Sequence, residues 1–329
     1  MGKTFKAAVY ETHGNPAEVL RVVDLPLPQL AANEVVVKMS AAPINPADLN
    51  GIEGKYPIKA PLPAVPGMEG TGVVIEIGSA VHDLNVGTPV ILPHNFGTWR
   101  EIAVIAAEKL VAVPKEIEPI QAAMLKVNPI TAWRMLHDFV SLQKGDWLIQ
   151  NAANSAAGQC VIQIARELGY KTVNVVRRAE LVDQLRSLGG DVVLVDGENL
   201  RDEVAAATSK ASIRLALNAV GGENALRVAK CLASDGTMVT YGAMSLQPLC
   251  IPNGMFIFKN LRFTGFWVNK WYEAATPQQR AETFAPLFDI AKRGLLRTKV
   301  EKTYPLAEAQ PAIAHASENK RNGKVLLML

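Results

Sequence analysis

The stretch QNAANSAAGQCVIQIA (Gln150–Ala165) joins the end of an apolar strand to the start of a helix, and it decides the fold. The letters DWLI before it read as a buried strand, and the helical pattern that follows ends at Gly169. Between them, small side chains allow backbone amides to approach a pyrophosphate, and the helix N-terminus attracts an anion. The stretch therefore predicts the first strand–turn–helix unit of a dinucleotide-binding domain, although Gly158 is the only glycine that fits G-x-G-x-x-G.

Strands and helices alternate after this turn. The predicted strands are KTVNVVR, DVVLVD, RLALNAVGG and GTMVTYGA, and a predicted helix is AELVDQLRSLGG. Such alternation requires a parallel, doubly wound sheet with right-handed crossovers. Before about residue 120 the chain instead has short β-branched runs separated by Pro, Gly and Asn, such as EVVVKMSA, GTGVVIEIG and TPVILP. The predicted fold class is α/β, with a barrel-like β-rich unit followed by a Rossmann doubly wound sheet.

Two arginines follow the second strand of the Rossmann unit. At this point the dinucleotide fingerprint places an acidic residue, which accepts hydrogen bonds from the adenosine ribose of NAD. Here stand Arg177 and Arg178. A guanidinium cannot accept from a 2′-hydroxyl but binds a 2′-phosphate well, so the sequence predicts NADP in preference to NAD. Two solvated arginines at a loop start are the alternative.

The bulk composition is that of a globular protein with two domains, because the chain has 329 residues, of which 49% are hydrophobic and 20% charged. The net charge of +3 and the lack of a long basic run argue against nucleic acid or a membrane as partner. The three cysteines and five histidines are scattered, so neither a disulfide framework nor zinc is expected. The N-terminal MGKTFKAAVYETHG has no apolar signal core and no amphipathic presequence, so a cytoplasmic location is expected.

The segment PGMEGTGVVIEIG resembles the G-H-E-x-x-G-x-V segment of the medium-chain dehydrogenase/reductase superfamily. The resemblance covers essentially the whole chain. It implies a GroES-like β-barrel catalytic domain (1–123), a Rossmann NADPH-binding domain (124–270) and a C-terminal segment (271–329) that returns to the catalytic domain. In the zinc enzymes of the superfamily a metal-binding His precedes this Glu, but here Met68 does, and the position of the catalytic Cys falls near Asn45. The resemblance therefore implies chemistry without a metal.

Within the superfamily, the chain resembles the mitochondrial-type 2-enoyl thioester reductases. The segments that carry this resemblance are APINPADLN, GKYP, FGTWRE, VNPITAWRML, GDWLIQNAANSAAGQ, VNVVRR, LALNAVGG, GTMVTYGAM, IFKNLRFTGFW and GKVLLML. That family uses NADPH to reduce enoyl-CoA or enoyl-acyl carrier protein, and its proposed proton donor maps onto Tyr56. Its cofactor contacts imply as cofactor-binding residues Asn45, Asn128, Asn154, Ser155, Ala156, Ala157, Gly158, Arg177, Arg178, Tyr241, Gly242, Ala243, Met244, Phe266, Trp267, Val268 and Lys324.

In the implied reaction, hydride from NADPH reaches Cβ, negative charge moves to the thioester oxygen, and Tyr56 supplies a proton to Cα directly or through water. Backbone amides, Asn45 or the cofactor ribose are alternative donors to the enolate oxygen. Glu69 is expected to be a structural carboxylate in preference to a catalyst. The remaining residues considered are Asp48 as a helix cap, Cys160 as packing, and His94, Trp133 and Trp267 as packing residues or walls of a substrate pocket.

Two other functions fit the same sequence. A zinc-free NADPH quinone reductase of the zeta-crystallin kind shares the fold and the cofactor, and a non-catalytic NADPH-binding or RNA-interacting protein is the more distant alternative. We also expect a homodimer. The apolar run MFIFKNLRFTGFW predicts that the last strands of the Rossmann sheet, around Gly254 to Phe266, pair across a two-fold axis, unless a helix of the same chain covers them.

Overall fold

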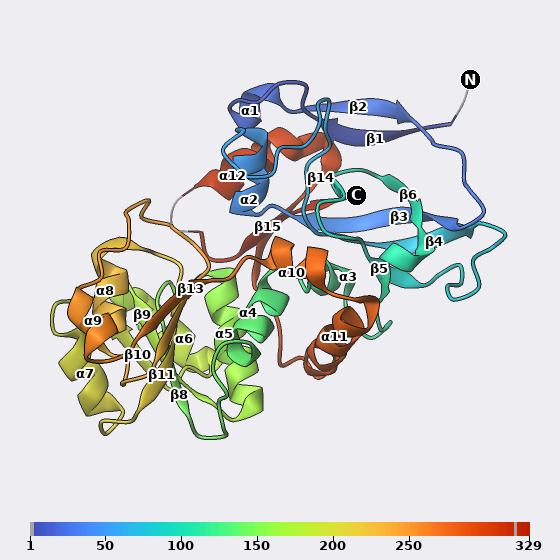
Figure 1. Cartoon of the computed structure of the whole chain (residues 1–329). Coiled ribbons are helices and arrows are strands. Elements are labelled where there is room, and N and C mark those ends of the chain that lie inside the picture. The colour runs from blue at the N-terminus through green and yellow to red at the C-terminus, as the bar shows by residue number, and fades with distance from the viewer. Residues whose placement is uncertain (1–2, 319–320) are drawn as a thin grey trace. The chain divides into compact units, whose positions relative to one another are not determined.

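The computed structural model of the chain describes residues 3–318 and 321–329 (Figure 1). The chain forms two compact units. The first comprises residues 1–127, 284–292 and 297–329, and the second comprises residues 128–283 and 293–296. Domain limits at residues 123 and 270, which come from the family pattern, stay a prediction. In the described part of the chain, no helix is long and apolar enough to cross a membrane.

The first unit is mainly β-structure. Its strands are β1 (Thr4–Val9), β2 (Arg21–Pro26), β3 (Glu34–Pro43), β4 (Thr71–Ile77), β5 (Pro89–Ile91), β6 (Ile102–Ala106), β7 (Val111–Ala112), β14 (Val300–Pro305) and β15 (Lys324–Met328). Its helices are α1 (Pro16–Val19), α2 (Pro46–Ile52), α3 (Pro119–Ala122) and α12 (Ala309–Ser317). The main sheet has the order β14-β15-β3-β4-β5-β7, and β6 also pairs with β3. A second sheet consists of the antiparallel pair β1 and β2.

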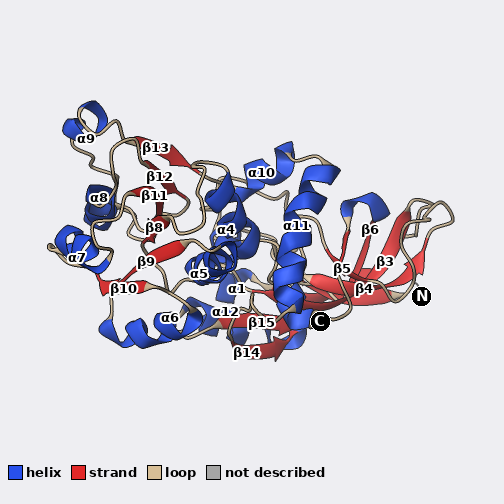
Figure 2. Cartoon of the chain, turned by 90° about the horizontal axis from the view of Figure 1, so that it is seen from below, coloured by secondary structure: helices blue, strands red, loops and turns tan. Residues whose placement is uncertain are grey.

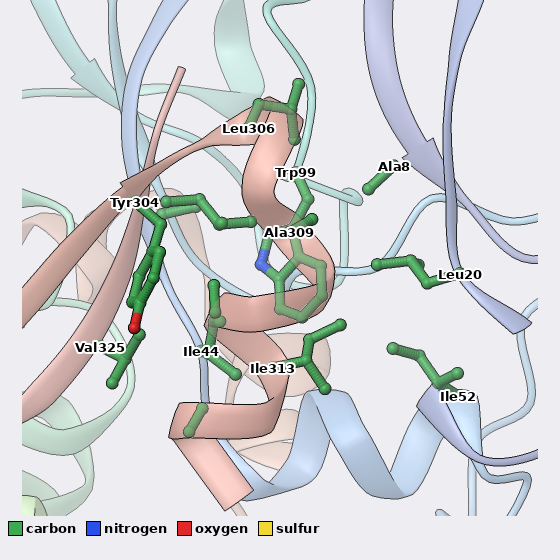
Figure 3. Packing of buried hydrophobic residues seen from close by; sticks show 14 of the residues in the cluster. Ala8, Leu20, Ile44, Ile52, Trp99, Tyr304, Leu306, Ala309, Ile313 and Val325 are labelled. Atoms are coloured by element: carbon green, nitrogen blue, oxygen red, sulfur yellow. The ribbon is translucent and has the colours of Figure 1, made fainter. Parts of the chain in front are cut away.

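The C-terminal segment belongs to the core of this unit. Trp99, which is fully buried, lies among Ile44 and the α12 residues Ala309 and Ile313 (Figure 3). Burying large apolar side chains from distant parts of the chain stabilises the unit by about 1.5–3 kcal/mol for each such side chain. Strand β15 pairs antiparallel with β3, and the N–H of Ile44 donates to the carbonyl of Val325. This pairing brings the start of β15 beside the end of β3.

The second unit is an α/β layer structure. Its strands are β8 (Trp147–Gln150), β9 (Lys171–Val176), β10 (Val192–Val195), β11 (Ile213–Asn218), β12 (Thr237–Thr240) and β13 (Arg262–Gly265). Its helices are α4 (Asn128–His137), α5 (Ala156–Leu168), α6 (Val182–Leu188), α7 (Leu200–Ala207), α8 (Gly222–Lys230), α9 (Asn253–Ile257) and α10 (Val268–Ala274). Helix α11 (Pro277–Lys292) contributes residues to both units.

The strand order of the second unit is β10-β9-β8-β11-β12-β13, and all neighbours are parallel. Numbered along the chain, this is the 3-2-1-4-5-6 order of the dinucleotide-binding fold. Helices α7 and α8 cover one face of the sheet, whereas α5 and α6 cover the other (Figure 2). The order reverses between β8 and β11, and ligands of such sheets bind at this point, beyond the carboxyl ends of the strands.

The prediction that residues around Gly254 to Phe266 form strands is wrong for the first half of that run. Residues Asn253–Ile257 form helix α9, and only Arg262–Gly265 form a strand, β13. Met255 is buried against the sheet core, whereas Phe256 and the two residues after it are exposed. Three consecutive exposed residues do not follow the alternation of a strand. A turn with positive φ at Asn260 then leads into β13, which lies at the edge of the sheet.

Candidate active site

A buried polar cluster surrounds the start of helix α2 in the first unit. The Asp48 carboxylate accepts two backbone hydrogen bonds, from the N–H of Asn45 at 2.8 Å and from the N–H of Met68 at 2.8 Å. The first of these bonds closes a capping box at the helix N-terminus, and the second fixes the 68–69 segment to the helix. Burial raises the pKa of Asp48 to about 7, although both backbone donors oppose this shift. Asp48 therefore has the capping role that the sequence predicted.

Glu69 is the most enclosed carboxylate of the cluster, with an exposed fraction of 0%. Its Oε1 accepts from Asn45 Nδ2 at 2.9 Å, and its Oε2 accepts from the N–H of Val127 at 2.8 Å. Burial raises the pKa of Glu69, and Lys324 gives the largest opposing contribution. A buried polar group with satisfied partners holds its surroundings in one arrangement, and this agrees with the expected structural role of Glu69.

Two buried lysines complete the cluster. Lys324, at the start of β15, donates from Nζ to Oδ1 of Asn45, and Lys126 Nζ donates to the carbonyl of Leu92 at 2.6 Å. Two carboxylates and two ammonium groups thus lie in one enclosed region, where unpaired charge is costly. Within residues 3–318 and 321–329, no group of three or more His, Cys, Asp and Glu side chains is placed to hold a metal ion.

Tyr56 lies in the loop that follows α2. Its backbone N–H donates to the carbonyl of Asn50, 3.1 Å away, and its side chain is half-buried. The end of α2 is held from outside the helix, because the carbonyl of Ile52 accepts from the N–H of Gly14 at 3.2 Å and lies 3.2 Å from Nδ1 of His13. The same helix that begins in the buried cluster therefore ends in the segment that carries Tyr56.

In the turn between β8 and α5, the backbone of the helix N-terminus lies close to the backbone of the turn. Ser155 is the N-cap residue of α5, and its hydroxyl accepts from the N–H of Gly158 at 3.1 Å. A Cβ atom on Gly158 would lie 2.7 Å from the carbonyl oxygen of Ala153 and 2.8 Å from that of Ala152. Glycine is required there because the helix packs directly on the turn. The helix ends at Gly169, which has a left-handed conformation as the sequence predicted.

A network of asparagines that the sequence analysis did not identify crosses the carboxyl ends of the parallel strands. Nδ2 of Asn151, directly after β8, donates to Asn218 at 2.7 Å and to Asn224 at 2.6 Å. Asn151 Oδ1 accepts from the N–H of Ala219 at 2.7 Å. The Asn218 amide in turn donates to Thr240 at 3.1 Å. The available signal was an Asn at the end of two predicted strands, in WLIQN and LALN.

The other predicted cofactor residues of the second unit lie on several loops. Arg177 directly follows β9 and is exposed, whereas Arg178 is half-buried and forms an ion pair with Glu180 at 3.4 Å. Burial raises the pKa of Tyr241 to about 12, and the Ser155 hydroxyl opposes this shift. The ring of Phe266 packs edge-to-face on Phe139, at a centroid distance of 6.1 Å.

The residues considered as alternatives for packing or pocket walls have different surroundings. Cys160 is buried on α5, as expected for a packing residue. Trp133 stacks on His137 with ring centroids 4.2 Å apart, and Trp267 and His94 are half-buried. Met244, which was predicted as a cofactor contact and not as a pocket wall, is 65% exposed. None of these contacts distinguishes a pocket wall from ordinary packing, so the roles of these residues stay predictions.

Two features of the second unit fit a dinucleotide. Gly158 lets the N-terminus of α5 pack directly on the turn, since an added Cβ would lie 2.7 Å from the carbonyl oxygen of Ala153, and Gly242 closely approaches the carbonyl of Ala219, at 3.0 Å from an added Cβ. In addition, Nδ2 of Asn128 is buried and has no acceptor among the described residues. A buried donor without a protein partner is satisfied when a ligand supplies the acceptor.

Comparison with known proteins agrees with this geometry. Residues 31–115 match the model of the alcohol dehydrogenase GroES-like domain, and residues 156–285 match that of the zinc-binding dehydrogenases. The chain is 45% identical over 315 residues to a mitochondrial enoyl-[acyl-carrier-protein] reductase of Rattus norvegicus, and the match covers 94% of this chain and 84% of the relative.

Solved structures also show similarity to reductases of this kind along the whole chain. A complex of Etr1p with NADP and crotonyl-CoA superposes with a TM-score of 0.91 at 32% identity and covers 99% of this chain and 100% of that one. A putative NADPH:quinone reductase from Bacillus thuringiensis superposes equally well, with a TM-score of 0.91 at 30% identity, and covers 100% of both chains. The predicted GroES-like and Rossmann architecture is thereby confirmed. The chain belongs to the enoyl thioester reductases of the medium-chain dehydrogenase/reductase superfamily.

Proposed function

We propose that this protein reduces the α,β double bond of trans-2-enoyl thioesters with NADPH. The observation that carries the proposal is 45% identity, along 94% of the chain, to an enoyl-[acyl-carrier-protein] reductase. Bound NADPH supplies the hydride that forms the new C–H bond at Cβ. The electron pair of the double bond then moves toward the thioester oxygen, and a proton added at Cα completes the saturated thioester. Both the CoA and the acyl carrier protein thioester fit this proposal.

Tyr56 is the proposed proton donor. It lies on the loop after α2, and the backbone bond from Tyr56 to Asn50 together with the capping box at Asn45 ties this loop to the buried cluster. A phenol is a weak acid, but it is a much stronger acid than the C–H bond formed at Cα, so proton transfer from the hydroxyl to the enolate carbon is downhill. A fixed loop supports the role, since proton transfer requires the hydroxyl to stay within hydrogen-bond reach.

The proposed cofactor contacts come from residues of the nucleotide turn and the neighbouring loops. Ser155 and Gly158 at the N-terminus of α5 would hold the pyrophosphate, and Arg177 with Arg178 would bind the 2′-phosphate. The ion pair between Arg178 and Glu180 is partly exposed to solvent and its atoms lie 3.4 Å apart, so it contributes little and leaves the guanidinium able to bind a phosphate. The remaining proposed contacts are Asn45, Asn128, Asn154, Ala156, Ala157, Tyr241, Gly242, Ala243, Met244, Phe266, Trp267, Val268 and Lys324.

Quinone reduction is the second candidate function. It is supported by the similarity to the putative NADPH:quinone reductase, which has the same TM-score as the Etr1p complex. The deciding experiment measures NADPH oxidation by the purified protein with crotonyl-CoA and, separately, with a simple quinone. A much higher kcat/KM for crotonyl-CoA supports enoyl reduction, whereas turnover of the quinone alone would refute it.

We also propose a homodimer that forms through the edge strand β13. Among the described residues this strand has a neighbour on one side only, and the adjoining helix α9 and the residue after it expose Phe256, Ile257 and Phe258, the last with an exposed fraction of 83%. An unpaired edge beside apolar side chains favours association with a second copy. The cytoplasmic location expected from the sequence stays a prediction, and the rat relative carries mitochondrial in its name.

A further inference from the structure

The buried carboxylate of Glu69 determines which way the Asn45 amide points. Oε1 of Glu69 accepts from Asn45 Nδ2 at 2.9 Å, while Oε2 is occupied by the N–H of Val127. Both oxygens of Glu69 thus accept hydrogen bonds, and the NH₂ end of the Asn45 amide faces Oε1 as the donor. The carbonyl end of Asn45 then points the other way, where it accepts from Nζ of Lys324.

The orientation of Asn45 matters because Lys324 is a buried cation. Its exposed fraction is 7%, and Asn45, its hydrogen-bond acceptor, lies 279 positions away in the sequence. The attraction between Lys324 and Glu69 is strong enough to be the largest influence that opposes burial at Glu69. If the Asn45 amide rotated by half a turn, its NH₂ group would face the Lys324 ammonium. Both groups are donors, so the hydrogen bond between them would be lost. Glu69 prevents this reversal.

We propose that Glu69 is a positioning residue for cofactor binding, which acts through the Asn45 amide to hold the Lys324 ammonium where it contacts NADPH. This inference rests on the proposed function, which assigns Lys324 to the cofactor. Both oxygens of Glu69 accept from protein donors, Asn45 and Val127, so its proposed effect on the cofactor is exerted through Asn45. The second oxygen of Glu69 accepts from the N–H of Val127. This bond fixes the carboxylate so that it can orient the Asn45 amide.

The first test is Glu69→Gln, which keeps the shape of the side chain. The new NH₂ group must face either Asn45 Nδ2 or the N–H of Val127, and both are donors. We expect the dissociation constant of NADPH, measured by fluorescence titration, to rise roughly tenfold, the typical effect of one hydrogen bond to a charged group. The KM for NADPH should rise in parallel, while kcat at saturating NADPH stays within about twofold. Glu76→Gln, on the exposed part of β4, is the matched control and should change neither value.

The second test separates positioning from an independent effect. Lys324→Met should also weaken NADPH binding, and adding Glu69→Gln to Lys324→Met should cause no further loss, because the positioned group is gone. If Glu69→Gln weakened NADPH binding equally in the wild-type protein and in the Lys324→Met variant, the positioning role would be refuted. An unchanged NADPH affinity in Lys324→Met would overturn the inference by removing Lys324 from the cofactor site. Neither result depends on turnover of crotonyl-CoA, so a failure of the proposed reaction is seen separately.

A folding defect is recognised by circular dichroism and by the melting temperature of each variant. If Glu69→Gln does not fold, Asn45→Ala removes the bridging amide and tests the same chain of contacts. The expected result is a roughly tenfold weaker NADPH complex in the Lys324 background and a clearly smaller loss in the Lys324→Met background, where only the contact proposed for Asn45 itself is removed. Equal losses of NADPH affinity in the two backgrounds would overturn the inference. An Asn45→Ala variant with wild-type NADPH affinity would overturn the inference.

Discussion

Replacing Gly158 by alanine tests whether the turn before α5 is the nucleotide site. The added Cβ would lie 2.7 Å and 2.8 Å from two backbone carbonyl oxygens, about 0.7 Å closer than the 3.4 Å of an ordinary contact. Backbone atoms cannot move aside as a flexible side chain can, so the N-terminus of α5 must shift away from the turn. Such overpacking costs about 1–3 kcal/mol of folding free energy.

The same shift moves the amides of the helix N-terminus away from the proposed pyrophosphate position. We therefore expect Gly158→Ala to weaken NADPH binding roughly tenfold or more, about 1.4 kcal/mol, besides lowering the melting temperature by a few degrees. Fluorescence titration with NADPH and thermal unfolding measure the two effects. Gly197→Ala is the control, because among the described residues no heavy atom beyond its two chain neighbours lies within 4 Å of its added Cβ. Wild-type NADPH affinity in Gly158→Ala would refute the reasoning.

Three further predictions concern the proposed active site. Tyr56→Phe should lower kcat for crotonyl-CoA by about 10²–10⁴ and leave quinone turnover unchanged, and an unchanged rate with crotonyl-CoA would remove Tyr56 as the donor. Replacing Arg177 and Arg178 by alanine should raise the KM for NADPH far more than that for NADH, whereas equal losses would contradict binding of the 2′-phosphate.

The third prediction concerns how the stability of the protein depends on pH. Because the pKa of Asp48 is raised to about 7 in the folded protein, its contribution to stability is present below pH ~4 and is lost as pH rises to about 7. Asp48→Asn should lack this slope in urea midpoints measured between those pH values, and a parallel slope in both proteins would contradict it.

The fold of the second unit could be predicted from the sequence because its signals are local. The helix from Ala156 to Leu168 carries its own N-cap and C-cap, and the strands on either side are short apolar runs. The residues of α9 were predicted as a strand because Phe and Ile favour strands in general. In the structure this helix buries Met255 against the sheet, and such a tertiary contact cannot be read from local propensity.

The hydrogen-bond networks could not be predicted, since their partners are far apart in the sequence. Asn151 and Asn218 are separated by 67 positions and meet only because β8 and β11 are neighbours in the sheet. An asparagine after a strand is also a common turn residue, so its type alone does not reveal a network. The family resemblance predicts Asn45 and Lys324 as cofactor residues, but it does not reveal that Lys324 donates to Asn45. Nor does it reveal that Glu69 accepts from the other end of the same amide.

The register between β15 and β3 is therefore part of the site. Leu326 pairs with Pro43, and this pairing brings Lys324 to the end of β3, next to Asn45. A shift of one residue in a strand sends every side chain to the opposite face of the sheet, and Lys324 would lose both its acceptor and its buried surroundings. Apolar packing of Leu326 and Leu327, which are fully buried, opposes such a shift. The hydrophobic core that closes the first unit thus also sets the position of the cation on which the proposed cofactor site depends.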